Sequence, residues 1–225
     1  QYDNNRVVPM LDTLSELDIP PRFQCLTYRF SLTFLRQSLQ HAIKPFEIQA
    51  TSLSSKEIDA PKRASFDFNS MFNAIGKVLA QENEQLIRKL FIVNAYHTWE
   101  RAVCKAFSIA APTEKDPQGF KKIEKAALRL DFVLHPDLTH VAYLTNILKH
   151  GRTKQAHQLY KEWPTLFTFP NSQQINIEEI ECLGWTASVR LDAMWIDKIF
   201  NILEQSGPPM FEEARRDCSG YEYPP

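Results

Sequence analysis

Hydrophobic residues recur through most of the chain at the three- and four-residue spacing of amphipathic helices. The longest such stretch covers residues 67–109, and the polar run at 81–83 is the point at which it would divide into two helices. Residues 26–43 show a two-residue alternation in their first half and a helical stripe along their whole length. Because no β-branched run follows Leu35, we expect one helix there, ended by Pro45.

Start and stop signals divide the second half of the chain. Asp116 followed by Pro117 predicts a helix that begins there and runs to about residue 134. Pro136 opens a shorter helix that we expect to end at Gly151, because glycine readily adopts the left-handed conformation of a helix C-cap. Two further helices are predicted, over residues 153–163 and 178–205.

The other stretches are less periodic. Residues 46–65 are rich in Ser, Thr and Pro, and alternation at 46–50 and 174–177 indicates two short strands. The tail at 207–225 has little periodicity, which predicts a loose end. No shift in composition marks a boundary, so residues 1–225 are expected to form one domain, a mainly α, multi-helix bundle.

The composition agrees with a helical core. The chain contains 15 Phe and only 6 Gly, which suits packed helices better than a turn-rich β-barrel. We expect the helices over 80–109 and 178–205 to pack against each other, because both are long and apolar on one side. The net charge of −1 argues against a protein that coats nucleic acid by bulk electrostatics, while a local basic patch stays compatible with it.

The spacing of cysteines and histidines and the hydropathy of the chain narrow the class of protein further. The four cysteines are far apart and form no C-x-x-C pair, which indicates free thiols in a reducing compartment. The six histidines lack the spacing of a zinc-binding helix, so neither a metal site nor a cofactor is expected. No apolar run reaches the roughly 18 residues of a membrane span. We therefore expect a cytoplasmic protein without a membrane segment.

The strongest candidate for chemistry is the helix predicted to end at Gly151. Asn146 and His150 are four residues apart and share one helix face, with Tyr143 a further turn back. The basic residues on or just after this helix end are Lys149, Arg152 and Lys154. Such a ridge of amide, ammonium and imidazole can bind a phosphodiester and transfer a proton, because histidine titrates near neutral pH. The alternative is an ordinary solvated helix end.

Residues 143–151, Tyr-Leu-Thr-Asn-Ile-Leu-Lys-His-Gly, resemble the catalytic helix of the HEPN superfamily. These α-helical domains occur in bacterial toxins, phage-defence nucleases and CRISPR-associated RNases. Their signature is an Arg and a His separated by a few residues, often with Asn after the Arg and Gly after the His. Asn146, His150 and Gly151 match this pattern, whereas Thr145 stands where active members have Arg.

A second segment adds to the resemblance. Residues 96–100, Tyr-His-Thr-Trp-Glu, are similar to the aromatic-plus-Glu segment on an earlier helix of some HEPN groups. The likeness covers about residues 85–205, a series of helices. It implies an HEPN-like bundle and a homodimer paired through the face that carries the motif, with two copies of His150 facing one cleft.

Two functions follow from the resemblance and both stay open. The first is a metal-independent endoribonuclease of a bacterial toxin–antitoxin or phage-defence system. His150 would act as base or acid on the ribose 2′-hydroxyl, and Asn146 and Lys149 would hold the phosphate. The residues expected to contact the RNA are Arg152, Lys154 and Tyr143. The second is an inactive HEPN-like interaction or sensor module that binds a protein or nucleic-acid partner, which the uncharged Thr145 favours.

Overall fold

The computed structural model describes residues 21–55, 68–168 and 184–208 of the chain. Within these ranges the regular elements are helices, with a single antiparallel bridge between Phe167 and Val189. The helices in chain order are α1 (Pro21–Ser55), α2 (Phe68–Ala110), α3 (Phe120–Arg129), α4 (Leu138–His150), α5 (Thr153–Glu162), the 3₁₀ turn η1 (Pro164–Leu166), α7 (Trp185–Ser188) and α8 (Ala193–Gln205). This confirms the expected mainly α fold.

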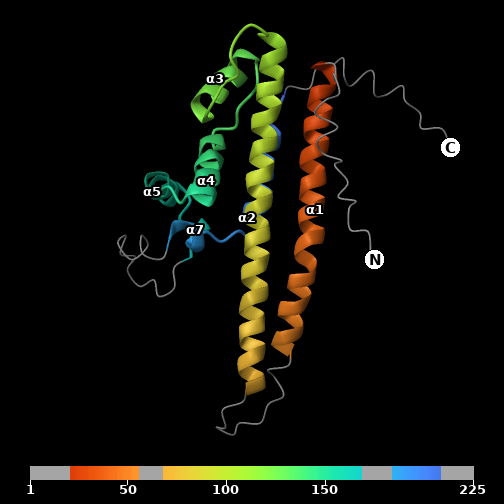
Figure 1. The fold of residues 1–225 in the computed structure, drawn as a ribbon, viewed down its shortest axis with the longest axis vertical. Coiled ribbons are helices and arrows are strands. Elements are labelled where there is room, and N and C mark those ends of the chain that lie inside the picture. The colour runs from red at the N-terminus through yellow and green to blue at the C-terminus, as the bar shows by residue number, and fades with distance from the viewer. Residues whose placement is uncertain (1–20, 56–67, 169–183, 209–225) are drawn as a thin grey trace, which may run out of the picture.

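The two long helices α1 and α2 form an antiparallel hairpin, which is the spine of the molecule (Figure 1). The short helices α3, α4, α5 and α7 lie along one side of the upper half of α2, while α8 contacts both α1 and α2. The other half of the hairpin, where α1 ends and α2 begins, extends beyond the short helices (Figure 1). None of the described helices is both long and apolar enough to cross a bilayer.

The hydrophobic core lies where α1, α2, α4 and α8 meet. Its fully buried side chains include Leu32, Leu39, Ile92, Trp99, Leu144, Ile147, Ile199 and Phe200. Each of these helices is therefore amphipathic in the way that the sequence pattern requires. The expected packing of α2 against the last helix is confirmed for the part of that helix that forms.

The predicted end of the first helix at Pro45 is wrong. α1 continues through Pro45 to Ser55, so the strand expected at 46–50 is helix instead. Proline removes one backbone donor, whose acceptor would be the carbonyl of His41, and both residues are exposed where water can satisfy that carbonyl. The extension is stabilised by packing on α2, since the side chain of Leu53 approaches Gly76 closely.

The helix expected from Asp116 also differs. α3 begins only at Phe120, after Gly119 at φ 80°, and it ends at Arg129 rather than near residue 134. The reason is tertiary, because Pro117 is buried and its carbonyl faces the thiol of Cys104 on α2 at 3.8 Å. Packing against α2 thus keeps the expected first turn out of the helix. The helix α2, in contrast, is continuous through 81–83.

The last predicted helix is shorter than expected. α8 begins at Ala193, where the carboxylate of Asp192 accepts a hydrogen bond from the Trp195 amide at 2.8 Å. Before it, α7 forms only a single turn, and the amide of Arg190 then donates to the carbonyl of Leu166, so the residues between α7 and α8 are not helical. The expected strand at 174–177, the acidic start at 178 and the tail beyond 208 lie outside the described residues.

The helix that carries the candidate motif forms as predicted. α4 ends at His150, and Gly151 adopts the left-handed conformation with φ 59° and ψ 33°. The Gly151 amide donates to the carbonyl of Ile147 at 2.8 Å, which closes the last turn. The next helix, α5, stops just before Pro164, also as expected.

A buried arginine ties the hairpin to the segment before α8. Arg88 of α2 is only 7% exposed, and its guanidinium donates to the carbonyl of Leu191 at 2.8 Å. The same group forms ion pairs with Glu84 at 2.5 Å and with Glu47 of α1 at 3.5 Å. One side chain therefore links three parts of the fold.

We expect Arg88→Ala to lower the free energy of unfolding by about 2–3 kcal/mol, because it leaves the largely buried carboxylate of Glu84 without its partner and removes one of the two hydrogen bonds that the Leu191 carbonyl accepts, the other coming from Gln85. Urea denaturation followed by circular dichroism measures this change. The matched control is Arg101→Ala on the exposed side of the same helix, which should cost less than about 0.5 kcal/mol. Equal stabilities for the two variants would contradict the linking role of Arg88.

Candidate functional site

The end of α4 lies against the middle of α2, and the contact joins three charged or titratable side chains. The ammonium of Lys149 is 3.2 Å from Nε2 of His97, and Nδ1 of His97 is 2.6 Å from Oε2 of Glu100. We call Glu100, His97 and Lys149 the α2–α4 relay. The side chains of His97 and Glu100 are 35% and 22% exposed, so the relay is open to solvent from one side.

The donor and acceptor roles within the relay follow from the chemistry of its end groups. An ammonium only donates hydrogen bonds, so Nε2 of His97 accepts from Lys149. A carboxylate only accepts, so Nδ1 of His97 carries the proton and donates to Glu100. One neutral tautomer of His97 satisfies both contacts. Its basic nitrogen, Nε2, then points towards the end of α4.

The carboxylate of Glu100 is held from a second side by Tyr96. Burial, and next the negative charge of Glu100, raise the pKa of Tyr96 far above its ordinary value, and the two side chains are hydrogen-bonded. The phenol therefore stays protonated and donates to Glu100. Since Tyr96 is buried among core residues, its position is set by packing. The orientation of His97 thus rests on a fixed carboxylate.

The local sequence explains why these side chains face one another. On α2, Tyr96 and Trp99 are buried, which leaves His97 and Glu100 on the adjoining, half-open face of the helix. On α4, Leu144 and Ile147 are fully buried in the core. Lys149 and His150 are exposed on the last turn of this helix, and Lys149 reaches from there to α2.

The sequence-predicted residues lie in three places: on the last turn of α4, on its preceding turns and at the start of α5. Lys149 belongs to the relay, and His150 is exposed beside it on the last turn of α4. Asn146 and Tyr143 are half-buried on the preceding turns of the same helix. The cations that follow, Arg152 and Lys154, are both exposed at the start of α5. Three basic side chains, those of Lys149, Arg152 and Lys154, are therefore exposed within six residues of one another where α4 ends and α5 begins.

Thr145, which stands where the HEPN resemblance would place an arginine, faces the core. It is 1% exposed, and its hydroxyl donates to the carbonyl of Val141 at 3.0 Å. A guanidinium at this position would have to leave water without a charged partner, which is costly. The positive charge next to His150 on this helix is that of Lys149.

Two relay members, His97 and Glu100, were not among the residues selected from the sequence for chemistry. Their segment was noted only through its resemblance to HEPN proteins. A usable signal was present, because a His and a Glu three residues apart share a helix face. The contact with Lys149 joins residues 52 positions apart, which spacing within one helix cannot indicate.

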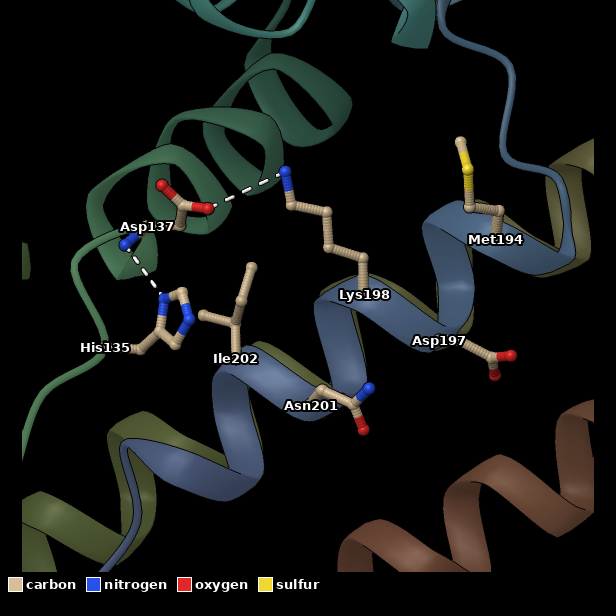
Figure 2. A pocket seen from close by; sticks show the side chains of 7 residues that line it. All are labelled: His135, Asp137, Met194, Asp197, Lys198, Asn201 and Ile202. Atoms are coloured by element: carbon tan, nitrogen blue, oxygen red, sulfur yellow. Dashed lines mark hydrogen bonds and ion pairs between the residues drawn. The ribbon is translucent and has the colours of Figure 1, made fainter.

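A hollow lies at the other end of α4, away from the relay. Figure 2 shows the side chains that line it, including His135, Asp137 and Lys198. It is open and measures about 610 Å³. Its polar groups already pair with one another: Asp137 contacts Lys198 at 3.6 Å, and the Asp137 amide donates to Nδ1 of His135 at 3.0 Å. The ammonium of Lys198 also lies 4.3 Å from the ring centre of Trp163. We interpret this cluster as structural.

No group of three or more potential metal ligands gathers among the described residues. The relay brings a carboxylate, an imidazole and an ammonium together, which are groups that can take part in acid–base chemistry. The chain matches no family model, no curated protein sequence and no solved structure.

Proposed function

We propose that the chain is an HEPN-like helical protein that binds RNA and cleaves it as a metal-independent endoribonuclease of a toxin or phage-defence system. The observation that supports the proposal is the α2–α4 relay, in which a carboxylate orients an imidazole towards an ammonium. Cleavage of a phosphodiester uses the same three kinds of group: a base, a partner that orients the base, and a cation.

The arrangement suggests a separate role in the reaction for each of these side chains. Nε2 of His97 takes the proton of the ribose 2′-hydroxyl once Lys149 has turned to a phosphate oxygen. The 2′-oxygen then forms its bond to phosphorus while the bond from phosphorus to the 5′-oxygen breaks. His150, exposed beside Lys149, supplies the proton to the leaving 5′-oxygen. The products are a 2′,3′-cyclic phosphate and a 5′-hydroxyl. Arg152, Lys154 and Tyr143 line the approach of the RNA.

The first test is cleavage of varied, end-labelled RNAs by the purified protein in the presence of a chelator. Wild-type protein should leave cyclic-phosphate ends, and His150→Ala should cut the rate by about 10²–10⁴-fold, the usual contribution of a positioned acid or base. The control is His41→Ala, which removes an exposed histidine from α1. Cleavage that survives unchanged in His150→Ala would remove His150 from the mechanism.

A second candidate function is an inactive HEPN-like interaction module. The burial of Thr145 favours it, because the family cation is missing from its usual turn of the helix. Wild-type protein that binds RNA or a protein partner and leaves every RNA intact would select this function. In that case the relay would serve binding alone.

A further inference from the structure

One face of α2, from the end beyond the short helices to the turns level with α7, exposes a row of large apolar side chains. Phe72, Ile75, Leu79, Leu86 and Leu90 are between 47% and 65% exposed. Their spacing of three, four, seven and four residues keeps them on one face of the helix. We call these five residues the α2 seam. Water contact along such a row is unfavourable, so the seam is suited to packing against another helix.

We infer that the α2 seam pairs with the same seam of a second copy of this chain, in an antiparallel arrangement about a two-fold axis near residues 82–83. In that register Leu79 lies opposite Leu86 of the second copy, and Ile75 lies opposite Leu90. Phe72 lies opposite Val93, which is half-buried and follows the seam on the same face. Every apolar position thus meets an apolar position, as a self-complementary interface requires.

The charged residue of this face that would sit nearest the axis is Glu82. Its carboxylate is already held to the side by Arg190, at 2.7 and 3.1 Å. Hydrogen bonding to Arg190 lowers the pKa of Glu82, so the carboxylate stays charged and paired. Two seams can therefore approach without bringing two free carboxylates together.

The surface has both the area and the shape for such a pair. The exposed parts of the seam, with the neighbouring Val78, amount to roughly 600 Å² per copy, and a stable pair needs about 1,000 Å² in total. A shallow hollow of about 270 Å³ lies on this face, lined by Ala74, Ile75, Val78 and Leu79. In the proposed register Leu90 of the second copy would enter it, as a knob enters a hole.

This pairing differs from the one that the HEPN resemblance implies. His97 lies about 14 residues from the axis, so the two relays would be about 40 Å apart at 1.5 Å per residue. Each relay would then work within one chain, and the inference stands whether or not the protein cleaves RNA.

Light scattering tests the pairing directly. Wild-type protein should be a dimer at micromolar concentration, and Leu86→Glu should raise the dissociation constant by about 100-fold or more, because it places an unpaired carboxylate in the apolar seam. The control is Val133→Glu, which alters a side chain that is 77% exposed and off the seam; it should leave the dimer intact. Circular dichroism checks that both variants remain folded.

Crosslinking distinguishes pairing through the α2 seam from pairing through the face that carries His150. Asn83→Cys lies next to the axis, so a short bis-maleimide should join two copies. Asn94→Cys, on the same helix but about 35 Å from its mate, should not be joined. A monomer at all concentrations would overturn the inference and point to another segment of the chain, or a different protein, on the seam. A dimer that tolerates Leu86→Glu, or that crosslinks only through cysteines beside His150, would overturn it as well.

Discussion

His97→Ala is expected to lower the rate of RNA cleavage by about 10²–10⁴-fold while leaving the fold intact. The variant removes the only group of the relay whose nitrogen can accept a proton, Nε2, which Glu100 orients and Lys149 contacts. His97 is partly exposed and its neighbours Tyr96 and Trp99 carry the packing, so stability should change little. Single-turnover cleavage and thermal unfolding measure the two effects separately.

Substitution of Glu100, the hydrogen-bond partner of His97, should have a smaller effect on the cleavage rate. Glu100→Gln keeps the shape of the side chain and an acceptor oxygen but removes the charge that stabilises the protonated imidazole. We expect it to reduce the rate less than His97→Ala does. Added imidazole should restore part of the activity of His97→Ala, which a purely structural defect would not allow. Full cleavage by His97→Ala would exclude the relay as the source of the base.

Trp99→Ala is expected to reduce the free energy of unfolding by about 3–5 kcal/mol, a large part of the 5–15 kcal/mol typical of a domain. The side chain is 0% exposed, and its indole donates to the carbonyl of Ser206 at 2.8 Å. The hydroxyl of Ser206 in turn accepts from the amide of His135 at 3.0 Å. Trp99 therefore joins α2, the end of α8 and the segment before α4.

A second variant separates packing from hydrogen bonding. Trp99→Phe keeps an aromatic ring near Tyr96 and Phe120, whose ring centres lie 5.7 and 6.3 Å from that of Trp99, but it loses the indole donor. We expect a cost of about 1–3 kcal/mol, smaller than that of alanine. The control, Leu128→Ala, alters a residue that is 57% exposed and should change little. Equal unfolding midpoints for Trp99→Ala and wild type would contradict this account of the core.

Elements whose signals are local could be predicted from the sequence. The long helix α2 was expected within one residue at each end, because its apolar periodicity extends over many turns. The end of α4 at Gly151 and the end of α5 before Pro164 were also predicted, since a glycine in the left-handed region and a proline stop helices by their own geometry. The candidate residues Lys149 and His150 were found for the same reason.

Elements that depend on distant contacts were missed. Pro45 does not end α1, because the helix continues where it can pack on α2, and Pro117 does not start α3, because it is buried beside Cys104. In both cases the energy of tertiary packing exceeds the local preference of one proline.

The candidate site was likewise predicted from the sequence only in part. The sequence by itself placed Lys149 and His150 at a helix end and marked Thr145 as a departure from the family pattern. Only the tertiary structure joined Lys149 to His97 on another helix and turned Thr145 into the core. The physical reason is that periodicity specifies which residues share a face of one helix, whereas the packing of two helices decides which faces meet.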